Sequence, residues 1–202
     1  MDRREFVGKS AVLGTTFWLL WNVPRPNTLR AAAGSTEPLV LSEEEWRTVE
    51  AITARIIPTD HDPGAVEANC VNFIDKALAH EDADLLPTYR EGLPAMNRLA
   101  VERFGAAFAE LEPDRQDQVL VAMESGQVSG WSPASVTSDE FFETVRSHTF
   151  IGFLADPKYG GNRDFAGWKV VGYPGPRHDL GGYTPAQMIG EERITAIWGA
   201  EV

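Results

Sequence analysis

The chain of 202 residues has four histidines and one cysteine, the side chains that most often perform acid, base or nucleophilic chemistry near neutral pH. His148 is the histidine that a catalytic site would use, because it lies three residues after Val145 in an apolar run of helical spacing. A general base needs an orienting carboxylate and a reacting group within hydrogen-bond reach, and the sequence has no G-x-S-x-G motif, no H-E-x-x-H motif and no second histidine four residues on. His178 lies in a loop rich in glycine and proline, and the sequence supports a catalytic role for it even less. We therefore expect His148 to be a structural residue and the chain to contain no catalytic residues.

The run Asp60-His61-Asp62 places three potential metal ligands side by side. Polar residues at such a position commonly form a turn between helices, and the closing glutamate of an EF-hand loop does not follow. The sequence also contains no G-x-G-x-x-G or P-loop motif for a nucleotide. We therefore expect a turn here, and neither a metal site nor a cofactor site in this chain.

Cys70 is the only cysteine, which excludes an internal disulfide, a cysteine-ligated iron–sulfur cluster and a C-x-x-C-H haem attachment. It recurs with Val66, Phe73 and Ala77 at helical spacing, so that a buried thiol in a helix is expected. A bridge from Cys70 to another subunit is the alternative.

The chain is strongly acidic, with a net charge of −12 from 18 basic and 30 acidic side chains. Without residues 1–33 it keeps 13 basic and 28 acidic side chains, a net charge of −15. This charge opposes binding to nucleic acid and to anionic lipid, and favours either solubility or a basic partner.

Apolar periodicity and capping residues predict an all-α fold. Ser42 and Glu45 form a capping box, Pro58 ends the first helix, and Pro94 is expected to bend or divide the third. The predicted helices cover residues 43–57, 65–79, 84–108, 113–124 and 138–155, and a short terminal helix covers residues 184–198. The sequence thus predicts one domain of about five helices over residues 34–155, to which an irregular arm, residues 156–202, also belongs.

The first part of this arm, residues 156–176, is named here the aromatic segment. It combines prolines, glycines and large aromatic rings, which together favour an ordered irregular segment lying against apolar surface. Trp168 and Tyr173 are expected to anchor it on a partner protein, with the alternative that both rings pack on the chain's own helices. The expected interface residues are Tyr159, Gly160, Gly161, Asn162, Trp168, Tyr173 and Pro174.

The aromatic segment also carries a family pattern: D-P-x-Y-G-G-N over residues 156–162, then Trp168, then G-Y-P-G-P over residues 172–176. A weaker match covers residues 56–60 and 63–65 and the helical run that follows, up to Leu78. In these residues the chain resembles the gluconate 2-dehydrogenase subunit 3 family, the small subunit of membrane-associated flavin sugar dehydrogenases. The resemblance implies a catalytic partner of the glucose–methanol–choline (GMC) oxidoreductase family that holds FAD and an iron–sulfur cluster. It also implies that electrons pass on to a cytochrome c subunit or to quinone.

The first 33 residues have the form of a twin-arginine (Tat) export signal. Arg3, Arg4 and Phe6 precede an uncharged run over residues 10–23, and alanines follow at residues 31–33. The uncharged run is shorter than the roughly 20 residues that cross a bilayer, which disfavours a membrane anchor. We expect a periplasmic protein at the inner membrane, held there through its complex, and leave open whether the signal is cleaved.

Two functions compete. In the first, the chain is a non-catalytic subunit that binds and stabilises the flavoprotein and carries its export signal. In the second, it is an independent periplasmic enzyme or sugar-binding protein that uses the aromatic segment as a pocket. The Tat route exports folded proteins, commonly with a cofactor inserted, and this chain has no motif to hold one. The first function is therefore expected.

Overall fold

The structure is a computed structural model that describes residues 37–126, 128–132, 135–177 and 181–200. The predicted export signal with Arg3, Arg4 and Phe6, and also His178, lie outside the described residues. The described residues are helical and contain no β-strand. The helices are α2 (Glu43–Ile56), α3 (Cys70–Ala79), α4 (Leu86–Phe104), α5 (Pro113–Glu124), α6 (Ser138–Leu154), α7 (Ala166–Val171) and α8 (Pro185–Met188). The predicted all-α class is confirmed, with seven helices in this part of the chain against the expected five or so.

Side-chain caps begin several of these helices. The Ser42 hydroxyl accepts a hydrogen bond from the Glu45 N–H at 3.2 Å, and the Glu45 carboxylate accepts one from the Ser42 N–H at 2.7 Å. Thr137 and Glu140 form the same reciprocal pair at the start of α6. These bonds satisfy N–H groups that have no partner within the helix, so the helices begin where the capping residues stand.

Two predicted helix boundaries, and the division of the third helix at Pro94, were wrong. The second helix begins at Cys70 and not near Ala65, because residues 65–69 form turns and Asn69 has a left-handed backbone with φ of 57°. Pro94 does not divide the third helix: α4 continues through it, with Leu93 and Met96 buried on either side. α8 ends after one turn at Met188 instead of extending to residue 198.

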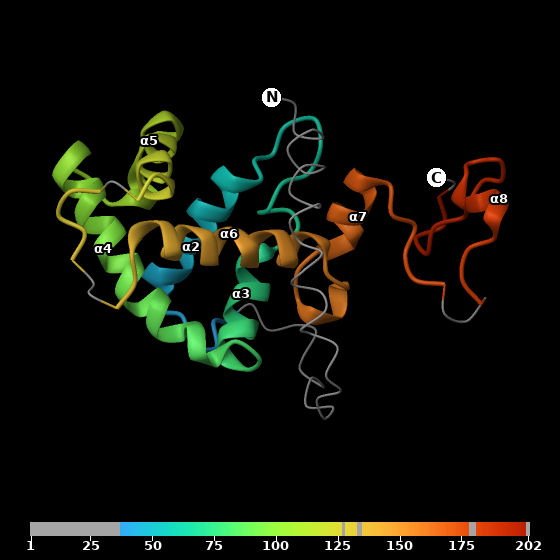
Figure 1. Cartoon of the computed structure of the whole chain (residues 1–202), viewed down its shortest axis with the longest axis horizontal. Coiled ribbons are helices and arrows are strands. Elements are labelled where there is room, and N and C mark those ends of the chain that lie inside the picture. The colour runs from blue at the N-terminus through green and yellow to red at the C-terminus, as the bar shows by residue number, and fades with distance from the viewer. Residues whose placement is uncertain (1–36, 127, 133–134, 178–180, 201–202) are drawn as a thin grey trace. The chain divides into compact units, whose positions relative to one another are not determined.

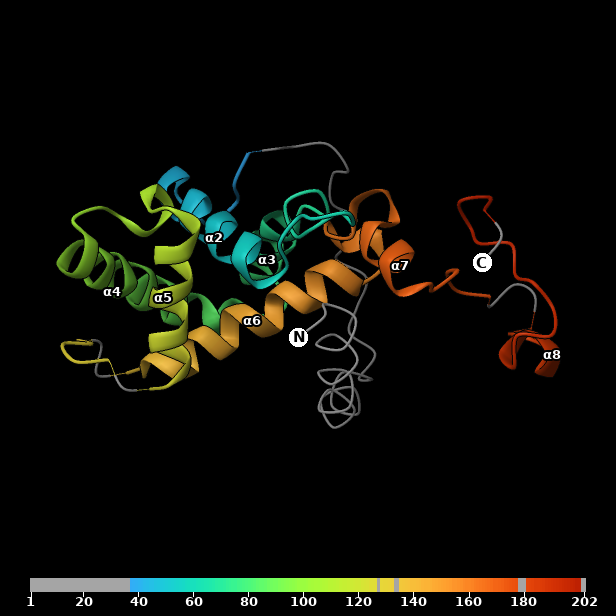
Figure 2. The same cartoon turned by 90° about the horizontal axis from the view of Figure 1, so that it is seen from above.

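Helix α6 is the centre of the core. It contacts α2, α3, α4, α5 and α7, an arrangement that can be followed in the two views of Figures 1 and 2. Phe141 and Val145 on α6 are fully buried, and the Phe141 ring occupies the space that a Cβ on Gly92 of α4 would need. No helix of the described residues has both the length and the hydrophobicity that are needed to cross a bilayer.

Candidate functional site

The aromatic segment caps the C-terminal end of α6. The Asn162 N–H donates to the Gly152 carbonyl at 2.7 Å, and the Asn162 side-chain amide donates to the Ala155 carbonyl at 2.8 Å. The Trp168 indole N–H donates to the Leu154 carbonyl at 2.6 Å. The last carbonyls of a helix have no partner within it, so these three bonds satisfy groups that would otherwise be unpaired.

Asn162 holds the aromatic segment in shape as well. Its side-chain oxygen accepts a hydrogen bond from the Gly167 N–H at 2.8 Å, which fixes the start of α7. The residue is fully buried and has a left-handed backbone with φ of 45°. Asparagine tolerates this conformation better than most residues do, and here its amide also uses both its donor and its acceptor.

Two glycines allow the close approach to α6. A Cβ on Gly161 would overlap the Gly152 carbonyl oxygen, and one on Gly167 would overlap that of Phe153. Gly160 has a different role, since its φ is 99° and its carbonyl accepts a 2.6 Å hydrogen bond from the side-chain amide of Asn72 on α3. Gly160, Gly161 and Gly167 are therefore required by contacts with α3 and α6.

The two expected anchors occupy different environments. Trp168 is only 5% exposed, so its indole packs within the chain and does not offer a face to a partner. Its ring stacks on Phe165 at a centroid distance of 5.7 Å and meets Tyr173 edge to face at 5.0 Å. Tyr173 and Tyr159 are each 38% exposed. The Trp168 ring therefore packs on its own chain, which is the alternative given above.

The remaining expected interface residues are also divided. Gly161, Asn162 and Pro174 are buried, and Gly160 is half-buried. Only Tyr159 and Tyr173 of the seven therefore present a large side chain to solvent. The sequence did not distinguish residues that build the segment from residues that its surface exposes, because both kinds belong to the same family pattern.

The segment and the helices before it are where the chain matches a known family. Residues 43–175 match the family model described as gluconate 2-dehydrogenase subunit 3. The chain belongs to the gluconate 2-dehydrogenase subunit 3 family. The match covers most of the described helices and ends inside the G-Y-P-G-P sequence of the aromatic segment. No curated protein and no solved structure matches the chain.

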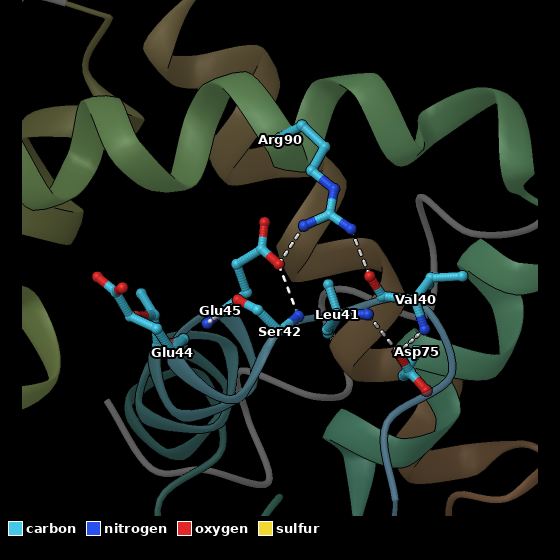
Figure 3. A network of polar contacts seen from close by, with 8 residues as sticks. Val40, Leu41, Ser42, Glu44, Glu45, Asp75 and Arg90 are labelled. Atoms are coloured by element: carbon cyan, nitrogen blue, oxygen red, sulfur yellow. Dashed lines mark hydrogen bonds and ion pairs between the residues drawn. The ribbon is translucent and has the colours of Figure 1, made fainter.

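A second polar site in this subunit 3 chain was not predicted from its sequence. The carboxylate of Asp75, on α3, accepts hydrogen bonds from the backbone N–H groups of Leu39, Val40 and Leu41 at 2.6, 3.0 and 2.9 Å. Figure 3 shows this carboxylate beneath the segment that leads into α2. Asp75 is 1% exposed, so the three donors replace water around a buried charge. The only signal in the sequence is an acid on the apolar side of a helix.

Arg90 of α4 holds the same segment from another side. Its guanidinium donates to the Glu45 carboxylate and to the Val40 carbonyl, as seen in Figure 3. Burial raises the pKa of Glu45, but the hydrogen bonds from Ser42 and Arg90 outweigh burial and hold this pKa below its ordinary value. Residues 39–42 are thus joined to α3 and α4 before α2 begins, and we name this site the N-terminal clamp.

His148 has the partners that sequence reasoning did not find. Its Nδ1 lies 2.8 Å from the Tyr89 hydroxyl oxygen and its Nε2 lies 3.4 Å from the Asp82 carboxylate. Burial, reinforced by the charge of Asp82, raises the pKa of Tyr89 well above its ordinary value, so the hydroxyl stays protonated in its hydrogen bond with Nδ1. His148 is 4% exposed and Tyr89 is fully buried. The group links α4 and α6 inside the core, as expected of a structural histidine.

Asp60, His61 and Asp62 form the expected turn. The Asp62 N–H donates to the Asp60 carboxylate at 2.8 Å, and the two His61 nitrogens lie 3.3 and 3.2 Å from the carboxylates of Asp60 and Asp62. Their potential ligand atoms lie within 4.8 Å of one another. Exposed polar clusters of this kind are common in turns.

An open hollow of about 640 Å³ lies between the start of α2 and one side of α4. Its lining includes Glu44 and Glu102 together with Arg90 and Arg98, and no residue of the aromatic segment belongs to it. The rings of Phe165, Trp168 and Tyr173 pack against one another instead. The hollow and the aromatic segment are therefore separate features of the described residues.

Cys70 is expected to be unreactive in the native chain. Burial raises the pKa of its thiol to about 12, and the thiolate is the reactive form, so only about one thiol in ten thousand is ionised at pH 8. Iodoacetamide should leave the native protein unmodified at that pH and label it fully in urea, as measured by intact mass. Rapid labelling of the native chain, or a reducible bridge to another subunit, would contradict this prediction.

Proposed function

We propose that this chain is the non-catalytic small subunit of a periplasmic FAD-dependent dehydrogenase acting on a sugar, a sugar acid or a glycoside. It binds and stabilises a GMC-type flavoprotein subunit and carries the Tat signal with which the two are exported. The observation that carries the proposal is the match of residues 43–175 to the family described as gluconate 2-dehydrogenase subunit 3.

The cofactors belong to the partner in this proposal. FAD and an iron–sulfur cluster reside in the flavoprotein, and a cytochrome c subunit or quinone takes up the electrons. The membrane association is provided through the complex. The net charge of −12 supports a protein partner over nucleic acid, because phosphates would be repelled.

The rigid attachment of the aromatic segment supports its use as an interface. Three hydrogen bonds fasten it to the end of α6, so its exposed side chains are held in place before a partner arrives. A preorganised surface loses less entropy on binding. This surface exposes Tyr159 and Tyr173. The ammonium of Lys158 lies 4.9 Å from the centroid of the Tyr159 ring.

Co-expression with a candidate GMC-type flavoprotein subunit encoded in the same genome tests the proposal. We expect the two chains to co-purify as a complex that contains FAD and reduces an artificial acceptor in the presence of one member of a panel of gluconate, glucose, fructose and glycosides. The chain expressed alone should be helical, colourless and inactive on the same panel. A flavin spectrum or sugar-dependent dye reduction in the single chain would overturn the assignment as a non-catalytic subunit.

Export provides a separate prediction. Replacing Arg3 and Arg4 together by lysine should retain both this chain and the flavoprotein in the cytoplasm, because lysine keeps the charge but not the planar guanidinium. Cell fractionation followed by detection of each chain measures the effect, and a single Lys9→Arg substitution is the control. If the flavoprotein reached the periplasm at normal levels in the double variant, co-export on this signal would be wrong.

A further inference from the structure

The chain continues beyond the family match with a segment that has its own folded contacts. We name residues 177–200 the terminal extension, of which 177 and 181–200 are described. Its end returns to the aromatic segment: the Ile197 N–H donates to the Pro174 carbonyl at 2.9 Å, and Trp198 stacks on Phe165 at a centroid distance of 5.5 Å. Gly175 has a φ of 98°, and a Cβ there would lie 2.7 Å from the Ile197 side chain.

Further contacts close the base of the extension. Tyr183 donates to the Gly175 carbonyl, and Arg177 donates to the Thr195 carbonyl. Residues 184–192 are thus held as a loop between two fixed ends, and α8 lies within this loop. A capping box of Thr184 and Gln187 begins α8, so the loop has a defined local structure.

The apolar side chains of this loop are exposed, and no residue of α8 is buried. Met188 is 75% and Ile189 is 70% exposed, the highest values among the large hydrophobic side chains of the described residues. Ordering a loop costs conformational entropy, and exposed apolar surface does not offset that cost within the chain. Met188 and Ile189 thus place two adjacent exposed apolar side chains on a loop that is fixed at both ends.

We propose that Met188 and Ile189 form a docking tip that inserts into an apolar pocket of the flavoprotein subunit. This inference rests on the proposed function and extends it to a surface outside the family match. The base of the extension packs on the aromatic segment, and the half-exposed Tyr173 and Ile197 belong to that junction, so one partner covers both surfaces. Glu191 and Glu192 follow the tip directly, which calls for basic residues around the partner's pocket.

The test compares two variants of the full chain, each co-expressed with the flavoprotein. Met188→Ser combined with Ile189→Ser should weaken the association at least about tenfold, because two buried apolar side chains are lost from the interface. Val121→Ser on α5 is the matched control, since Val121 is 64% exposed but lies far from the extension in the sequence, and it should leave the affinity unchanged. The melting temperature of the lone chain should stay the same in both variants, because the side chains are exposed.

The outcomes separate this inference from the proposed function. An unchanged affinity in the double variant, with a normal wild-type complex, overturns the docking tip and leaves the proposed function intact. Failure of the wild-type chain to bind the flavoprotein overturns both. If the lone wild-type chain is a dimer that the double substitution dissociates, a second copy covers the tip and the flavoprotein assignment is wrong. Replacing Glu191 and Glu192 by glutamine should reduce the salt dependence of the association; an unaltered salt dependence rejects the basic rim.

Discussion

Replacing Gly167 by alanine is expected to lower the free energy of unfolding by about 4 kcal/mol. A Cβ at this position would overlap the carbonyl oxygen of Phe153, which is backbone and cannot move aside as a flexible side chain would. Overpacking of this kind costs roughly 1 to 3 kcal/mol. The shift that relieves it also weakens the bond from the Gly167 N–H to Asn162, and leaving such buried groups unpaired costs a further 1 to 3 kcal/mol or so.

Gly172→Ala is the matched control for this substitution. Gly172 ends α7 with a φ of 71°, and nothing lies within 4 Å of a Cβ built there, so alanine meets backbone strain alone. That strain costs about 1 to 2 kcal/mol. Urea unfolding followed by circular dichroism compares the two variants. Equal losses would show that the aromatic segment adjusts freely, and the tight attachment to α6 would then be wrong.

Replacing Asp75 by alanine is expected to lower the free energy of unfolding by about 4 kcal/mol, because three backbone N–H groups lose a charged acceptor. Hydrogen bonds to charged groups contribute roughly 1.5 to 3 kcal/mol each, and the two outer donors recover part of this from water. The bond from Leu41 is buried, so its N–H has no such replacement. The N-terminal clamp should open, and residues 37–42 should become sensitive to limited proteolysis.

Two further variants make the test of the clamp specific. Asp75→Asn keeps the shape and one acceptor oxygen, so its loss should be about half that of alanine, roughly 2 kcal/mol. Asp84→Ala removes an exposed aspartate and should change the stability by less than about 0.5 kcal/mol. A small loss for Asp75→Ala, within 1 kcal/mol or so of the Asp84 control, would mean that the clamp contributes little.

Local sequence determined the class of the fold and most of its helices. The capping box at Ser42 and Glu45 and the proline at position 113 each act within one turn of the helix that they begin, so their effect can be deduced without knowing the rest of the fold. The burial of Cys70 was likewise predicted, and Phe73 and Ala77 of the same pattern are buried on the same helix, whereas Val66, the first member of the pattern, lies before the helix and is exposed. The family pattern could be recognised for the same reason, because it is contained in a short stretch of chain.

Tertiary structure decided what those residues do. Tryptophan is a residue type that often anchors interfaces. In this chain Trp168 is instead buried against the end of α6, because the last carbonyls of that helix need a hydrogen-bond donor. In the sequence Asp75 is an ordinary acidic residue of a helix. Its three N–H donors come from residues 39–41, more than thirty residues away in the sequence. His148 gains its role from Tyr89 and Asp82 in the same way. Periodicity and caps are local, whereas burial and the pairing of polar groups depend on contacts between distant parts of the chain, which a single sequence does not specify.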